Sequence, residues 1–339
     1  MNRIGSRLTR AAAGLACGVF ALWLAGSAVA QEEAKVPAAL PEAPAEMTSI
    51  VDHGYFKGAS CEKDGECCKS LGTDRLLLAV FELDPARPAT QFRIRYDAAW
   101  GYNRPDRAEY FFAQQLARGP NAVNTNVDYQ DIRIYYEAAS DFISIFTDLG
   151  VRSLDPSTSP DTTGFNDMNV GIKSRVLAGE KYELTSIFRT YIPSGNASKG
   201  LGVGHVSLEP GLLGNYRLGC KTYLHGEFKF WIPIGGTNGF AGNILRYGTG
   251  VSHLLWESCN KPIAVIPTLE FVGWTVLDGA ETLPGGVVTP VDGVWIFNVQ
   301  PGIRTTLGKH FDVGVSSAYS LTGDRWYDSL CRLDLRWVF

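Results

Sequence analysis

Charged side chains recur at every second position in many short stretches of this sequence, with apolar side chains between them. In residues 91–100, for example, Arg93, Arg95 and Asp97 alternate with aliphatic and aromatic residues. Successive side chains of a strand point to opposite faces, so each such strand has one charged and one apolar face. A charged face shared by many strands can bind or guide small polar solutes. We expect on this face, as candidates to line a pore, Arg93, Arg95, Asp97, Arg133, Glu137, Lys173, Arg175, Arg189, Glu209, Glu227, Glu270, Arg304, Arg332, Asp334 and Arg336.

Two interpretations of this charged face stay open. Basic groups modestly outnumber acidic ones, which would make a pore favour anions. Alternatively, opposite charges pair across a narrow interior and fill it.

Six cysteines remain once the first 30 residues are set aside, and five of them are candidates for disulfides. Cys61, Cys67 and Cys68 precede the first clear strand, whereas Cys220 and Cys259 lie in expected short turns. In an oxidising compartment these five would lie on one side of a membrane and can pair, although the connectivity cannot be read from the sequence. Their spacing matches no standard zinc pattern, and we predict no metal and no cofactor.

The histidines give no sign of nucleophilic catalysis. Ser252 and His253 are adjacent, so in a strand they face opposite sides and cannot pair. We therefore expect no serine–histidine pair and no enzyme, with an outer-membrane lipase-type hydrolase as the less favoured alternative.

Alternation of apolar and polar residues predicts twelve strands. The last of them, 327–339, ends on Phe339, and a terminal aromatic on such a strand is typical of chains that the barrel-assembly machinery inserts into the bacterial outer membrane. The other expected strands are 91–100, 127–139, 141–149, 166–177, 181–192, 204–217, 220–232, 243–255, 262–276, 293–307 and 309–321.

Short turns alternate with long polar loops between these strands, which is the asymmetry of outer-membrane barrels. The sequence therefore predicts an all-β transmembrane antiparallel barrel of about 12 strands, with short periplasmic turns and longer extracellular loops. Tryptophans fall near the strand ends, where interfacial girdles place them. Pro210 and Pro301 lie inside expected strands and predict bulges there.

The N-terminal part divides into three further ranges. Residues 1–30 have a charged start, an apolar stretch and a small-residue cleavage site, which predicts a secretory signal peptide. Residues 31–50 are rich in Ala, Pro and Glu and predict a disordered linker. Residues 51–88 contain the cysteine cluster and predict a periplasmic segment before the barrel at 89–339. Within them, 74–84 fit either a short helix or a first strand.

The net charge argues against nucleic acid as a partner. Without the three arginines of the leader, the 31 basic residues become 28, against 35 acidic ones. No basic block stands out, so the expected partners are outer-membrane lipid and small solutes.

From residue 164 to the end the chain resembles the outer-membrane β-barrel family named for the meta-pathway of phenol degradation. The similar stretches are GFNDMNVGIKSRVL (164–177), YIPSGNASKGLGVG (191–204), EPGLL (209–213) and YRLG (216–219). These are strand and turn patterns rather than chemical motifs. The resemblance implies a barrel that acts as a channel for small, including aromatic, compounds, and it leaves the cysteine-bearing segment unexplained.

Together these observations predict a channel for passive uptake or efflux of small aromatic or anionic solutes in the outer membrane of a Gram-negative-type bacterium. A non-conducting barrel that anchors a periplasmic partner is the main alternative.

Overall fold

The computed structural model describes residues 75–103, 126–258, 262–283 and 285–339. The expected leader (1–30), linker (31–50) and the cysteines Cys61, Cys67, Cys68 and Cys259 lie outside these described residues.

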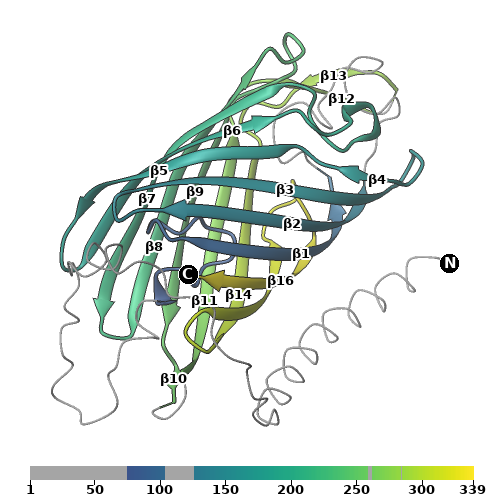
Figure 1. Ribbon diagram of the computed structural model, residues 1–339. Coiled ribbons are helices and arrows are strands. Elements are labelled where there is room, and N and C mark those ends of the chain that lie inside the picture. Colours follow the sequence, from purple (N-terminus) through teal and green to yellow (C-terminus); the bar gives the residue numbers. More distant parts are fainter. Residues whose placement is uncertain (1–74, 104–125, 259–261, 284) are drawn as a thin grey trace, which may run out of the picture. The chain divides into compact units, whose positions relative to one another are not determined.

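Twelve long antiparallel strands form one closed barrel in the described part of the chain (Figure 1). Each strand pairs with its neighbours in sequence order, as expected when a short turn or a loop joins adjacent strands. The prediction of an all-β, twelve-stranded antiparallel barrel is confirmed. The strands are β1 (Gln91–Tyr102), β2 (Val127–Ala139), β3 (Ile143–Pro156), β5 (Met168–Ala178), β6 (Tyr182–Ile192), β7 (Val206–Gly219), β8 (Thr222–Ile234), β9 (Ile244–His253), β11 (Ile263–Val276), β14 (Trp295–Leu307), β15 (Phe311–Ser320) and β16 (Ser329–Val338).

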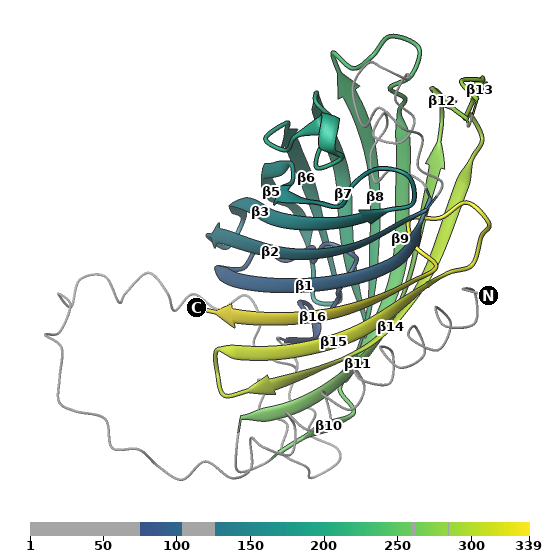
Figure 2. The ribbon, with the colours of Figure 1, turned by 90° about the vertical axis from the view of Figure 1, so that its right-hand side faces the viewer.

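The barrel closes where its first and last strands meet. β1 pairs with β16 in an unbroken register from Gln91 opposite Val338 to Trp100 opposite Ser329. Figure 2 shows β16 between β1 and β15 in the wall that faces the viewer. A closed barrel leaves none of these twelve strands with an unpaired edge, which is what a lipid environment requires.

Shorter elements extend this wall. β4 (Thr162–Phe165) pairs with the end of β3, so β3 continues to Pro156 instead of ending near 149 as expected. β10 (Trp256–Glu257) pairs with β11, and β12 (Ala280–Thr282) forms a separate hairpin with β13 (Val288–Pro290). The 3-10 turn η2 (Ala197–Lys199) lies in the loop before β7.

The bulges expected at Pro210 and Pro301 are absent from the described strands. The register of β6 with β7 runs without a shift through Pro210, and that of β11 with β14 runs through Pro301. Each proline instead lies where the ladder to its other neighbour is interrupted. Proline lacks an N–H donor, so this gap accommodates it without a bulge.

The two faces of the barrel are chemically opposite. Large apolar side chains such as Ile132, Ile145 and Phe228 are exposed on the outside, whereas charged residues such as Lys173, Arg304 and Asp334 are fully buried on the inside. This distribution suits a wall between hydrocarbon and a polar interior. No helix within the described residues is both long and apolar enough to cross a membrane.

Candidate functional site

Residues 75–90, here called the luminal segment, pass through the inside of the barrel. The first of them, Arg75, donates a hydrogen bond to the carbonyl of Lys309 in the short turn between β14 and β15. The last, Thr90, bonds to Ala139 at the short turn after β2. Both ends of the segment therefore lie at the short-turn end of the barrel. Arg75 and Leu76 are helical and a turn follows them, whereas residues 79–90 form bends and irregular backbone, so the strand that the sequence also allowed is not formed there.

Side chains of the barrel satisfy the backbone carbonyls of the luminal segment. Arg304 donates to the carbonyl of Ala79 (3.1 Å), and Arg332 donates to that of Phe81 (2.8 Å). Buried carbonyls need such partners, because an unpaired one costs about 1–3 kcal/mol. The segment is thus bonded to the wall along its length.

The carboxylate of Glu270 binds three consecutive backbone N–H groups of the luminal segment. Its Oε1 accepts from Phe81 N (2.7 Å), and its Oε2 accepts from Glu82 N (2.9 Å) and Leu83 N (2.8 Å). Successive N–H groups that converge in this way form a concave anion site, here filled by a wall carboxylate.

Glycines on the inner face make room for the apolar side chains of the segment. A Cβ on Gly302 or Gly314 would lie 2.6 Å from the ring of Phe81, and one on Gly248 would lie 2.6 Å from Leu83. Real Cβ atoms do not approach so closely, so these side chains occupy space that any other residue would fill.

The acidic side chains at the tip of the segment form ion pairs with the wall. Asp84 Oδ2 lies 2.8 Å from Arg189 and 2.5 Å from Lys229. Burial would raise the pKa of the Asp84 carboxyl, but these two cations outweigh burial and hold that pKa well below its ordinary value.

Glu82 is held in the same manner by two other strands. Its carboxylate lies 2.8 Å from Arg332 and 3.5 Å from Arg246. Burial acts to raise the pKa of Glu82, but both guanidinium groups counteract it, and the pKa lies below its ordinary value. Both tip residues are therefore anions at neutral pH.

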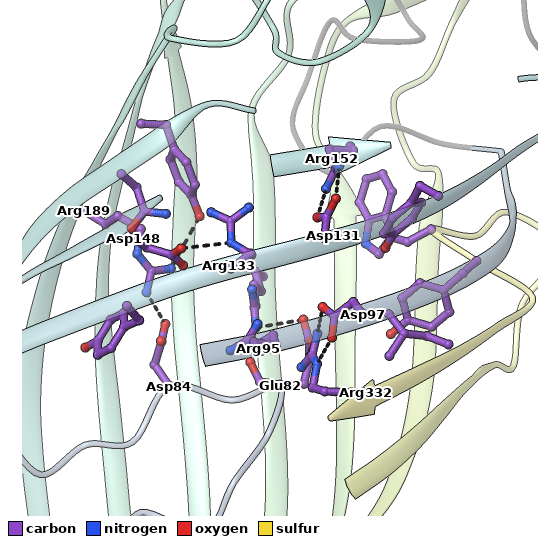
Figure 3. Close-up of a pocket in the computed structure, with 18 of the residues that line it drawn as sticks. Glu82, Asp84, Arg95, Asp97, Asp131, Arg133, Asp148, Arg152, Arg189 and Arg332 are labelled. Atoms are coloured by element: carbon purple, nitrogen blue, oxygen red, sulfur yellow. Dashed lines mark hydrogen bonds and ion pairs between the residues drawn. The ribbon is translucent and has the colours of Figure 1, made fainter. Parts of the chain in front are cut away.

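A cavity of about 160 Å³ lies against the tip of the luminal segment (Figure 3). Among its lining residues, Tyr102, Trp231 and Trp274 lie at or near the strand ends that lead into the long loops. Seven arginines, five carboxylates and eight aromatic residues line the cavity, together with Asn169 and Leu330. The aromatic residues are Tyr102, Tyr129, Tyr135, Tyr191, Trp231, Trp274, Trp326 and Tyr327; the charged ones are Glu82, Asp84, Arg93, Arg95, Asp97, Asp131, Arg133, Asp148, Arg152, Arg189, Arg246 and Arg332.

Several of these arginines form two-point ion pairs with wall carboxylates. Arg332 donates to both oxygens of Asp97 (2.7 and 2.8 Å), and Arg152 does the same to Asp131 (2.7 and 2.7 Å). Arg95 differs from them. Its Nε lies 3.9 Å from Asp334 and has no hydrogen-bond partner among the described residues. The Nε of Arg93 lies 3.6 Å from the same carboxylate and likewise has no hydrogen-bond partner among these residues, so Arg93 and Arg95 are the lining arginines best placed to bind an added anion.

Three tryptophans face the interior, contrary to the expectation that they form interfacial girdles. Trp231, Trp274 and Trp326 are buried and line the cavity, and the rings of Trp274 and Trp326 are 5.7 Å apart, edge to face. Trp256 and Trp295 are exposed on the outside, as a girdle requires. The position of a tryptophan at a strand end does not reveal which face it occupies.

The fifteen residues that the sequence analysis placed on the charged face all lie on the inner side of the barrel strands, buried or nearly so. Many are paired: Lys173 with Glu137 (3.2 Å), and Arg304 with Asp334 (2.9 Å). Cys220 lies in the turn between β7 and β8. The disulfide pairing of this cysteine with the other candidates stays a prediction.

A serine–histidine pair exists, contrary to the sequence analysis. His225 Nε2 lies 2.9 Å from Ser252 Oγ, and His225 Nδ1 lies 2.9 Å from Asn215 Oδ1. The pair joins two adjacent strands, so it depends on a register that the sequence does not show. Ser252 is fully buried and donates to the carbonyl of Leu76 (3.0 Å), so in this structure the group holds the luminal segment.

The luminal carboxylates Glu82 and Asp84 were not among the residues predicted from the sequence. The apolar run 76–81 directly before them was the available signal. It precedes the first expected strand, so its side chains have to be buried somewhere other than in the barrel wall. Asp131 shares the alternation of its strand with the predicted residues Arg133 and Glu137 and could have been found by extending it, whereas Arg152 lies beyond 149, where its strand was expected to end.

An outer membrane channel from Pseudomonas putida F1 has a similar fold, with a TM-score of 0.51 at 13% sequence identity, over 76% of this chain and 100% of that one. The NanC porin and the KdgM porin each give a TM-score of 0.43 at 7% identity; the alignments cover 72% and 74% of this chain, and 98% and 99% of the respective porins. These two likenesses are too weak to add to the argument. No protein-family model and no curated protein matches the sequence, so the resemblance to the phenol-degradation family stays a hypothesis. At 13% identity the likeness to the Pseudomonas protein concerns the fold alone.

Proposed function

We propose that this protein is an outer-membrane channel for small anionic solutes, including aromatic carboxylates, which pass through the barrel passively. The observation that supports the proposal most directly is the cavity, where seven arginines face five carboxylates among eight aromatic rings. Guanidinium groups bind carboxylates in a fixed planar geometry, and aromatic walls favour ring-shaped solutes.

The luminal segment closes this channel in the proposal. It occupies the short-turn half of the interior and bonds to strands on several sides of the barrel, so a solute that has reached the cavity can proceed only when the segment moves. The protein would thus combine a polar conduit with a closing element from its own chain.

We infer from the apolar outer face that the barrel lies in the outer membrane. The charged start of the chain would direct secretion, and the strand that ends at Phe339 would engage the barrel-assembly machinery. The remaining cysteines before the barrel would be oxidised in the periplasm.

Single-channel conductance of the refolded protein in a planar bilayer tests the proposal, with the reversal potential measured under a salt gradient. Discrete current steps with a preference for anions are the expected result. Heat-dependent gel mobility shows independently that the barrel is folded. A folded protein that never conducts, even when residues 75–90 are removed, would contradict the channel and favour the anchoring barrel.

The same preparation tests the enzyme alternative. A fluorophosphonate probe would label Ser252 covalently if the hydroxyl beside His225 were an activated nucleophile. We expect no labelling, because the serine is buried beneath the luminal segment.

A further inference from the structure

The tip of the luminal segment places two carboxylates where the wall is richest in cations. Glu82 faces Arg332 and Arg246, and Asp84 faces Arg189, as Figure 3 shows for the labelled residues. Both acids and these three arginines line the same cavity. A solute that enters the cavity therefore meets the ion pairs of the tip directly.

The charge of the cavity depends on these two side chains. Two of the five lining carboxylates belong to the tip, so the wall alone presents seven arginines and three carboxylates. Without the tip the lining has four surplus positive charges, and with it two. A buried surplus of this kind is costly and needs an anion. Glu209 and Glu227, which lie behind the lining, offset part of this surplus through Arg189 (2.9 Å) and Arg246 (2.6 Å), and Glu82 and Asp84 supply further negative charge in the closed state.

We propose that Glu82 and Asp84 occupy a binding site for a dicarboxylate solute, which competes with the tip of the luminal segment and so favours the open channel. This inference rests on the proposed channel function. It assigns dicarboxylates to the cavity as the substrate class. The carboxylates of the luminal segment then occupy the substrate site when no substrate is bound.

Two features favour a dicarboxylate over a compact anion. The two carboxylates of the tip have separate partners, since Glu82 is bound from β16 and β9 and Asp84 from β6 and β8. Their residues are two apart in sequence, so their Cα atoms are at most about 7 Å apart. A linear dicarboxylate such as adipate can span two such sites, whereas sulfate can fill only one of them.

The competition is between a free and a tethered anion. The segment is joined to β1 by a few residues, so its carboxylates act at an effective concentration on the order of millimolar. A solute that binds the same cations is therefore expected to act in the millimolar range, and removal of the tethered carboxylates should make its binding about tenfold tighter.

The test compares adipate with hexanoate and sulfate at constant ionic strength, on the full-length refolded protein. Intrinsic fluorescence reports binding, because Trp231, Trp274 and Trp326 line the cavity, and single-channel recording reports the open probability. The variant E82Q/D84N removes both tip charges. E180Q, in the exposed turn between β5 and β6, is the matched control.

We expect adipate, but neither hexanoate nor sulfate, to raise the open probability of the native protein and of E180Q. In E82Q/D84N the channel should be open without adipate, and adipate should bind about tenfold more tightly. If the double variant does not fold, Asp84→Asn alone allows the same comparison.

Two results would overturn the inference while the channel stands: adipate that acts no differently from hexanoate, or an affinity for adipate that E82Q/D84N leaves unchanged. A protein that conducts under no condition would contradict the channel function itself. The fluorescence titration would then still decide whether the tip carboxylates occupy a dicarboxylate site.

Discussion

Replacing Glu270 by glutamine should release the luminal segment. The carboxylate of Glu270 accepts the N–H groups of Phe81, Glu82 and Leu83 at 2.7–2.9 Å, and the residue is fully buried. Glutamine has nearly the same shape but only one acceptor oxygen. Whichever way the amide lies, at least one of the three backbone donors then faces an NH₂ group.

The size of the effect follows from these three bonds. Charge-assisted hydrogen bonds contribute about 2 kcal/mol each and neutral ones about 1 kcal/mol. In the best orientation, two neutral bonds replace three charge-assisted ones, so docking of the segment loses about 4 kcal/mol. Because each 1.4 kcal/mol is tenfold, the docking equilibrium shifts by a factor on the order of 10³. The channel should then be open most of the time.

Single-channel recording of Glu270→Gln measures this change, with E180Q as the control. The substitution changes only one inner side chain, so we expect the barrel to fold, and the heat-dependent gel shift checks that it does. A folded E270Q barrel with the open probability of the native protein would refute the reasoning. Either Glu270 would not hold the segment, or the segment would not close the channel.

Three further predictions concern the same lumen. Gly314→Ala places a Cβ 2.6 Å from the ring of Phe81; overpacking of this kind costs about 1–3 kcal/mol, so the open probability should rise by about fivefold or more. The pKa values of Glu82 and Asp84 are lowered on docking, so their ion pairs stabilise the closed state at neutral pH. This stabilisation is lost as the pH falls below about 4, and the open probability should rise there. The variant E82Q/D84N should abolish the rise. Arg95→Gln should shift the reversal potential toward weaker anion preference, because it removes the lining cation with the loosest carboxylate contact.

Each of these predictions has a control in the chain. Gly226→Ala adds a methyl group to an outward position where the nearest atom is 3.8 Å away, so it should leave gating unchanged. Lys181→Gln removes an exposed charge in a short turn and should not alter selectivity. If Gly226→Ala opens the channel as Gly314→Ala does, general loosening of the barrel explains the effect, and contact with Phe81 does not.

The strands could be predicted from the sequence because lipid and a polar interior impose an alternation that each strand shows by itself. Residues 91–100, expected as a strand, form most of β1. The inner position of Arg93 and Asp97 follows from that alternation alone. The sequence thus predicts those properties, such as the inner or outer face of a side chain, that depend only on residues adjacent in the chain.

The luminal segment could not be predicted in this way. The place of Phe81 depends on Gly302 and Gly314, which lie more than two hundred residues away and on different strands. The pair of Ser252 with His225 likewise needs the register between β8 and β9. An apolar run before the first strand gives no sign that its partners are polar side chains of a barrel interior.

Arg332 also has a consequence for how the barrel assembles. It lies on the last strand, directly opposite Asp97 on the first strand, and it binds the carbonyl of Phe81 as well. A slip of the two strands by two residues would preserve the inner and outer faces, yet it would place Arg332 opposite Arg95 or Ala99. The alternation of faces cannot prevent such an error, but the ion pair can. Correct pairing of the first and last barrel strands and placement of the luminal segment against them therefore become a single event in folding.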